Sequence, residues 1–203
     1  MASLFVCVLL LVAGLPASRA QITLDGSMGP AGPLAGPDYR IDAGVGQMRG
    51  SNLFHSFAEF NVRAGESATF RGPGPVDNII GRVTGGHPSV VDGRVRSEIP
   101  DANVYLLNPR GVVFGPDASL EIDGSFHVST ADYLRFADGG AFYADPAKTG
   151  VLSVAPPEAF GFLGETPAGI AVRGGQLGVP GDKTLSVIGG NVRVEGGMVS
   201  APG

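Results

Sequence analysis

The sequence has almost no cysteine, and its one cysteine, Cys7, lies in an apolar stretch at the N-terminus. Beyond that stretch the chain has no thiol, which excludes disulfides, cysteine metal sites and thiol nucleophiles there. A secreted domain made from the remainder must therefore be stabilised by its own core. The lack of thiols also suits a chain that crosses an oxidising compartment while unfolded.

Lysine is also scarce, at Lys148 and Lys183, tryptophan is absent, and the formal net charge is −5. The chain has no basic stripe of the kind that binds nucleic acid, and no Lys and Arg cluster that suits an anionic membrane surface. We therefore expect no nucleic-acid partner.

Helical periodicity is almost absent, and the chain is rich in glycine, with 33 glycines in 203 residues. Short runs of alternating apolar and polar residues dominate, each bounded by Gly, Asn, Asp or Pro, which predicts an all-β chain of short strands and tight turns. A sandwich, a barrel and a solenoid all fit this pattern. Residues 156–162 are the one candidate for a short helical segment. The clearest alternating runs are 68–71, 120–123, 126–129, 185–187 and 192–195.

The last third of the chain favours the solenoid. Strands alternate there with Gly189-Gly190 and Gly196-Gly197, and the pattern is still running at Gly203. A coil of stacked rungs can stop anywhere, whereas a closed sandwich ends with a completed sheet. We therefore expect further rungs after residue 203 and interpret the chain as the N-terminal part of a longer protein. Leu120, Ile122, Val187, Val192 and Val194 are predicted to point inward, and Arg193 and Glu195 to face water.

Residues 1–20 carry the features of a secretory signal peptide. The apolar stretch from Leu4 to Leu15 is too short to span a bilayer, and Pro16 interrupts it. Ser18-Arg19-Ala20 places small residues where signal peptidase cleaves. We predict cleavage after Ala20, which leaves residues 21–203 as one domain, and Sec-dependent delivery across the inner membrane.

The histidines His55, His87 and His127 have no metal-ligand spacing, so we expect no metal and no cofactor. His127 lies between two apolar residues of an alternating run and is predicted to face outward. None of the histidines has an acid–base partner that the sequence places beside it.

The carboxylates are scattered, and Asp92, Asp123 and Asp138 each precede a glycine, which predicts turns. We find no catalytic residue and expect that the protein is not an enzyme. The alternative is a secreted β-helical polysaccharide lyase or hydrolase. Such an enzyme would require a cleft lined by acidic residues or arginines along one face of the coil.

The most informative segment is residues 108–112, Asn-Pro-Arg-Gly-Val, between the apolar runs 104–107 and 112–114. Pro109 sets the φ that the second position of a turn needs, Asn108 can bond its own backbone ahead of the turn, and Gly111 suits the last position. We therefore predict strand, tight turn, strand. One capping bond from Asn108 is expected to contribute about 1 kcal/mol.

The 108–112 turn resembles the Asn-Pro-Asn-Gly-Ile signature of the filamentous haemagglutinin secretion domain, the domain of two-partner secretion. Arg110 replaces the usual Asn, Val112 replaces Ile, and the second signature of some members, Asn-Pro-Asn-Leu, is missing. Further blocks are similar to the family and follow in its order, at residues 51–57, 60–62, 78–86, 91–93, 114–120 and 124–132.

The resemblance implies a right-handed parallel β-helix with antiparallel strands that cap its N-terminal end. It also implies a secretion-targeting domain of a large exported adhesin of a Gram-negative cell. The POTRA domains of a partner outer-membrane β-barrel transporter would recognise this domain after it reaches the periplasm. Folding of the β-helix would then start outside the cell, and the full-length protein could bind a host-cell or surface ligand. The residues implied in recognition are Asn108, Pro109, Arg110, Gly111 and Val112 in the 108–112 turn, and Asn52, Leu53, Phe54, His55 and Phe57 in the 52–57 segment.

Overall fold

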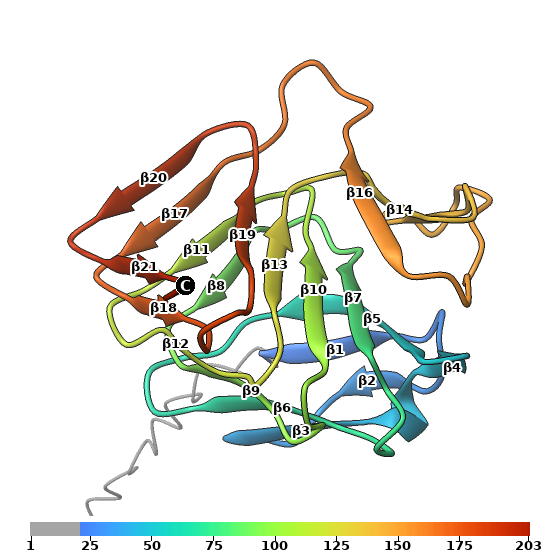
Figure 1. The fold of residues 1–203 in the computed structure, drawn as a ribbon, viewed down its shortest axis with the longest axis horizontal. Helices are drawn as coiled ribbons and strands as arrows, with labels where there is room; N and C mark the ends of the chain where they lie inside the picture. The colour runs from blue at the N-terminus through green and yellow to red at the C-terminus, as the bar shows by residue number, and fades with distance from the viewer. Residues whose placement is uncertain (1–20) are drawn as a thin grey trace, which may run out of the picture.

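The computed structural model describes residues 21–203, so the predicted signal peptide, residues 1–20, lies outside the described residues. The chain is all-β and winds into a right-handed parallel β-helix of about six turns, as the resemblance implied (Figure 1). Among residues 21–203, the one helical element is the short 3-10 helix η1 (Ala43–Val45). Within the described residues, no helix is long and apolar enough to cross a membrane.

Three parallel sheets form the sides of the solenoid, and each complete coil contributes one strand to each sheet. The chain passes from the first sheet to the second and then to the third before it returns to the first. The first sheet contains β5 (Asn52–Phe60), β7 (Asn78–Val83), β10 (Asn103–Leu107), β13 (Phe126–Ser129) and β19 (Leu185–Ile188). The second contains β8 (Ser89–Val91), β11 (Val112–Phe114), β17 (Ile170–Arg173) and β20 (Val192–Glu195). The third contains β3 (Asp38–Asp42), β6 (Ser67–Arg71), β9 (Arg94–Ser97), β12 (Ser119–Glu121), β18 (Gln176–Gly178) and β21 (Met198–Ser200).

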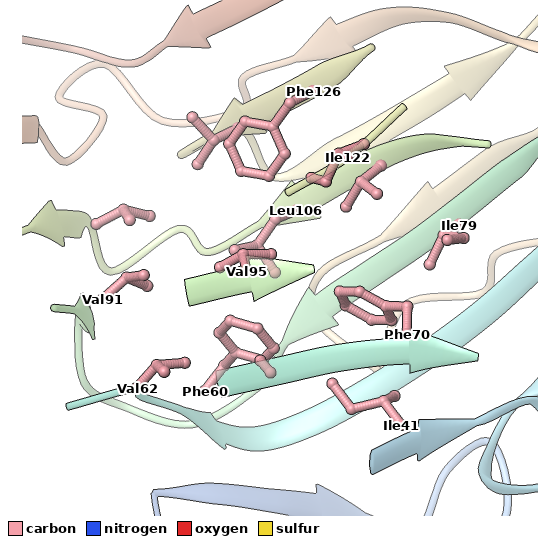
Figure 2. Close-up of a cluster of buried hydrophobic side chains, with 14 of the residues drawn as sticks. Ile41, Phe60, Val62, Phe70, Ile79, Val91, Val95, Leu106, Ile122 and Phe126 are labelled. Carbon is pink, nitrogen blue, oxygen red and sulfur yellow. The ribbon is translucent and has the colours of Figure 1, made fainter. Parts of the chain in front are cut away.

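The register stacks apolar side chains directly on one another from coil to coil. In the first sheet, Ile79 of β7 pairs with Leu53 below it and with Val104 above it. Because successive side chains of a strand point to opposite faces, every second residue faces the axis. Figure 2 shows the result, in which side chains such as Phe70, Val91 and Leu106 converge from the three sheets.

The predicted inward direction of Leu120 and Ile122 is confirmed. Ile122 is buried in the main core, and the partly buried Leu120 packs against it, as does Val187. Val192 and Val194 lie in register with the buried residues Ile170 and Val172, so they point inward as predicted. Their side chains are nevertheless 42% and 51% exposed, because β20 is the last strand of its sheet and one side of each valine is uncovered in the described chain.

Antiparallel strands cover the N-terminal end of the first sheet, as the resemblance implied. The strand β1 (Ile22–Asp25) pairs antiparallel with β5 and with β2 (Ala31–Pro33), and β4 (Gln47–Arg49) pairs antiparallel with β5. Ile22 lies opposite Phe60, and both side chains are completely buried. This cap closes the hydrophobic core at its beginning.

One insertion leaves the coil between β13 and β17 and forms a small antiparallel sheet, seen on the right of Figure 1. Its strands are β14 (Tyr133–Phe136), β15 (Ala141–Tyr143) and β16 (Pro157–Gly161). The prediction of a short helical segment at 156–162 is therefore wrong, because pairing with β14 holds these residues in an extended strand. The insertion packs on the outer face of the first sheet through a second core, made of Met28, Phe54, Ile80, Leu107, Leu134, Phe136 and Phe142.

Candidate functional site

The 108–112 turn has the predicted geometry. The Gly111 N–H donates to the Asn108 carbonyl at 3.0 Å, and Pro109 and Arg110 occupy the bend. Gly111 has a φ of 114°, a value that a residue with a Cβ rarely adopts. The turn joins β10 to β11 and so carries the chain around the corner between the first and second sheets.

The Asn108 side chain is buried and makes three hydrogen bonds, where the sequence predicted one. Its Oδ1 accepts the Arg110 N–H at 2.9 Å, which is the predicted cap. Its Nδ2 also donates to the Ser89 Oγ at 2.9 Å and to the His87 carbonyl at 3.2 Å. Asn108 therefore fastens its own coil to the preceding one as well as closing its turn.

The surface of the 108–112 turn is formed mainly by Arg110, which is exposed, and Pro109, which is partly exposed. Asn108 and Val112 are completely buried. Both Pro109 and Arg110 line a cleft of about 450 Å³, which is also lined by Asp145 and Lys148 of the insertion. A partner that binds the folded domain can therefore reach this motif only through these two side chains.

The 52–57 segment is closed off from solvent. Asn52, Leu53, Phe54, His55 and Phe57 are each 0% exposed. Leu53 and Phe57 belong to the main core, whereas Phe54 points to the other face of the sheet and is covered by the insertion.

Two aromatic rings of the insertion hold Phe54. The ring centroids of Phe136 and Phe142 lie 5.9 and 5.1 Å from that of Phe54, both in edge-to-face arrangements. A folded domain therefore presents none of the 52–57 side chains to a partner.

Asn52 begins a ladder of asparagines that the sequence analysis missed. Its Nδ2 donates to the Ser153 and Ala155 carbonyls of the insertion at 2.9 and 2.7 Å. Its Oδ1 accepts the Asn78 Nδ2 at 2.9 Å, and the Asn78 Oδ1 accepts the Asn103 Nδ2 at 3.1 Å. The signal was available, because each asparagine is the first residue of a strand of the first sheet.

His55 lies among aromatic rings in the main core, 6.0 Å from the Phe57 ring and 5.7 Å from the Phe70 ring. Neither ring nitrogen has a hydrogen-bond partner in the part of the chain that the structure describes. Burial lowers the pKa of His55 from its ordinary 6.5 to about 4, so the ring is neutral near pH 7. His127 lies outside the main core, as predicted, but it stacks on Tyr105 at 4.4 Å and its pKa falls to about 4 for the same reason.

Arg82 is a further buried residue that the sequence analysis missed, and it joins three parts of the fold. Its guanidinium donates to the Ser56 Oγ at 2.8 Å, to the Tyr143 carbonyl at 2.7 Å and to the Ser27 Oγ at 3.0 Å. These partners come from β5, from the insertion and from the loop after β1. Its guanidinium carbon also lies 4.8 Å from the centroid of the Phe142 ring, in a cation–π contact.

Asp25 lies beside this cluster. Burial raises the pKa of Asp25, but hydrogen bonds from Ser56, Ser27 and Thr84 outweigh that effect and bring the pKa below its ordinary value. The carboxylate is therefore ionised at neutral pH, and it complements the charge of Arg82.

The turn predicted at Asp138 is confirmed, since Asp138 lies in a turn and its Oδ1 accepts the Gly140 N–H at 2.9 Å. Asp92 instead links two coils, because its Oδ1 accepts the Asp117 N–H at 3.0 Å. Asp123 lies in the bend that follows β12. Within residues 21–203, no group of three His, Cys, Asp or Glu side chains is placed to hold a metal ion.

Comparison with known proteins decides the family. The family model described as the TPS secretion domain matches residues 20–203. The chain belongs to the TPS secretion domain family. A segment of 81 residues is also 30% identical to the heme/hemopexin-binding protein of Haemophilus influenzae (strain ATCC 51907 / DSM 11121 / KW20 / Rd). That segment is 40% of this chain and 8% of the relative, so the chain spans a small part of the length of the curated protein that it matches.

Membership of the TPS secretion domain family indicates two-partner secretion, in which a partner transporter exports the protein to the cell surface or the medium. This is a family of secretion and adhesin domains and not a known enzyme family. The polysaccharide lyase or hydrolase alternative is therefore not favoured.

Proposed function

We propose that residues 21–203 are a targeting domain that the POTRA domains of the partner transporter recognise while the chain is still unfolded in the periplasm. In this scheme, Sec delivers the chain and signal peptidase removes residues 1–20. The domain then folds outside the cell and starts the β-helix of a large adhesin.

The burial of the candidate recognition residues is the observation that carries this proposal. Every named residue of the 52–57 segment is 0% exposed, as are Asn108 and Val112. In an unfolded chain the same residues are accessible, and an extended segment can add as a strand to an exposed sheet edge through main-chain hydrogen bonds. Recognition before folding therefore explains how a partner could contact residues that are buried in the folded domain.

The architecture supports folding from the N-terminal end. The cap formed by β1, β2 and β4 closes one end of the first sheet, and β5 then offers its free edge to β7. Each later coil needs the preceding one as its template, because its backbone groups and its inner side chains pair with that coil. Folding outside the cell could in this way draw the remaining chain outward.

A disulfide that staples two coils provides the test. Arg173 and Glu195 are neighbours in register on the parallel strands β17 and β20, and their side chains are 65% and 62% exposed. Adjacent strands lie about 4.8 Å apart, which is within the range that a disulfide spans. In the double variant Arg173→Cys, Glu195→Cys, oxidation in the periplasm would therefore link the two strands covalently in any chain that has folded there, with little change to the core.

We expect the oxidised double variant to accumulate in the periplasm of cells that carry the cognate transporter, and dithiothreitol to restore its export. The readout is the ratio of secreted to periplasmic protein, with the two single-cysteine variants as matched controls. Export of the disulfide-linked form at the level of the unmodified chain would contradict recognition and passage in the unfolded state. Export in cells without the transporter would contradict the two-partner route itself.

A further inference from the structure

A shallow hollow lies on the outer face of the third sheet, away from both recognition segments. It has a volume of about 320 Å³ and is lined by Asp38, Arg40, Ser67, Thr69, Arg71, Arg94, Arg96 and Glu98. These residues belong to β3, β6 and β9 and to the position just after β9. Four arginines and two carboxylates line the hollow, and at its edge Asp42 pairs with Arg71, and Glu121 with Arg94 and Arg96. Among the described residues, Arg40 is the one arginine of the hollow that forms no ion pair.

The floor of the hollow is made of short hydroxyl side chains, and arginines rise on both sides of it. Thr69 of the middle strand pairs in register with Arg40 on one side and with Arg96 on the other. Thr69 is 7% exposed, whereas both arginines are exposed. Because neighbouring strands lie about 4.8 Å apart, the two arginines start about 10 Å from each other, with the threonine between them.

Two of these groups are not engaged by the protein. Among the described residues, the Arg40 guanidinium has no ion pair and no hydrogen bond, and the same is true of the Thr69 hydroxyl beside it. Arg94 and Arg96 contact Glu121 at 3.5 and 3.2 Å, in pairs whose side chains are between 44% and 53% exposed. Exposed pairs of this kind contribute little to stability, so a ligand anion can replace the glutamate at small cost.

We propose that this hollow binds an anionic saccharide, with a sulfate or carboxylate group held between Arg40 and Arg96 over Thr69. The planar arginine fork matches the oxygens of such a group and can donate two parallel hydrogen bonds to it. Ser67, Thr69 and Asp38 supply the donors and acceptors that sugar hydroxyls need. The Ser67 hydroxyl already donates to Asp38 at 2.8 Å, which leaves its oxygen lone pairs as acceptors.

A saccharide fits this surface better than an acidic peptide does. β6 is an internal strand, hydrogen-bonded to β3 on one side and to β9 on the other, so the floor offers no free edge to a peptide backbone. The lining mixes carboxylates with arginines, and the side chains of an acidic peptide have no hydroxyl groups that could donate hydrogen bonds to Asp38 and Glu98. A ligand with both hydroxyl and anionic groups uses both kinds of side chain.

The test is calorimetric titration of the secreted chain with a heparin-derived hexasaccharide and with an oligogalacturonate of similar length. These probes separate sulfate from carboxylate recognition, and binding of either one supports the proposal. We expect the double variant Arg40→Ala, Arg96→Ala to weaken that binding at least tenfold. The matched control is Arg135→Ala, Arg173→Ala, which removes the same charge from exposed positions elsewhere and should change the affinity less than twofold.

Two single variants measure what the planar guanidinium of Arg40 and the hydroxyl of Thr69 contribute to binding, apart from net charge. Arg40→Lys keeps the charge but not the planar fork, and Thr69→Val keeps the shape but not the hydroxyl, so each should weaken binding several-fold. Equal loss in the two double variants would reduce the effect to net charge and overturn the proposal, as would the absence of binding to both probes. Binding of a glutamate oligomer that is as tight and equally sensitive to Arg40 would assign the hollow to acidic peptides instead and would also overturn it.

Discussion

The 52–57 segment and the 108–112 turn carry the same functional expectation, but the fold treats them differently. The 52–57 segment lies in a strand whose two faces are both covered, by the solenoid core on one side and by the insertion on the other. The 108–112 turn lies at a corner of the coil, where Arg110 remains exposed beside a cleft. A strand with two buried faces cannot present side chains to a folded partner, whereas a corner can.

The two segments can therefore contact a partner at different stages, either before the domain folds or after it has folded. Residues of the 52–57 segment are accessible to a partner before folding and contribute to stability afterwards. Residues of the 108–112 turn divide between these roles, since Asn108 fastens two coils and Arg110 faces solvent. Four variants, taken from the largest expected effect to the smallest, test this division.

Phe54→Ala should have the largest effect. It removes a completely buried ring that contacts Phe136 and Phe142, so we expect a loss of about 4 kcal/mol in the free energy of unfolding. Denaturant titration of the purified domain measures this loss. Phe162→Ala is the matched control, because Phe162 is 36% exposed and its removal should cost less than about 0.5 kcal/mol. Similar losses for the two variants would contradict the second core.

Acid should destabilise the domain through His55. The folded-state pKa is about 4 and the ordinary value is 6.5, so between these values the unfolded chain binds a proton that the folded chain does not. The free energy of unfolding therefore falls as the pH is lowered from 6.5 towards 4, by up to about 3 kcal/mol from this residue.

The measurement for His55 is the slope of stability against pH between 4.5 and 6.5. His127 adds to the slope in the same direction, but it is partly exposed and its share is smaller. His55→Leu should remove most of the His55 contribution to the slope and leave the His127 part. An unchanged slope in His55→Leu would show that the ring is already paired or solvated in the folded state.

Asn108→Ala should cost about 2 kcal/mol, more than the single cap predicted from the sequence. It leaves the Ser89 hydroxyl, the His87 carbonyl and the Arg110 N–H without their partner. Thermal unfolding and the secreted-to-periplasmic ratio are measured on the same variant. A large export defect without a loss of stability would indicate a recognition role for Asn108 that is separate from its structural one.

Arg110→Asn, which restores the residue usual in the family signature, should have the smallest effect. Arg110 is exposed and its side chain has no ion pair within the described residues, so we expect a stability change below about 0.5 kcal/mol and normal export. The same two assays apply. A strong export defect would show that this chain and its transporter are matched through Arg110 in the folded or folding turn.

The sequence by itself determined the elements of this fold. Period-two runs between glycines define short strands, and Asn, Pro and Gly define the 108–112 turn, because these signals depend on neighbouring residues along the chain. The direction of Leu120 and Ile122 followed from the same local alternation. Alternation alone could not distinguish a β-helix from a sandwich or a barrel. The resemblance of the ordered sequence blocks to the family implied the β-helix and also the role in secretion.

The tertiary structure alone decided which of these residues a partner can reach. Phe54 is on the outer face of its strand, yet an insertion from far along the chain covers it, and no local pattern encodes that contact. Val192 and Val194 have the alternation of core residues but lie exposed on the last strand of their sheet. The coil register likewise aligns Asn52 with Asn78 and Asn103, and Arg40 with Thr69 and Arg96. Such neighbours are about one coil apart in sequence and one strand apart in space, so their chemistry arises only when the coils stack.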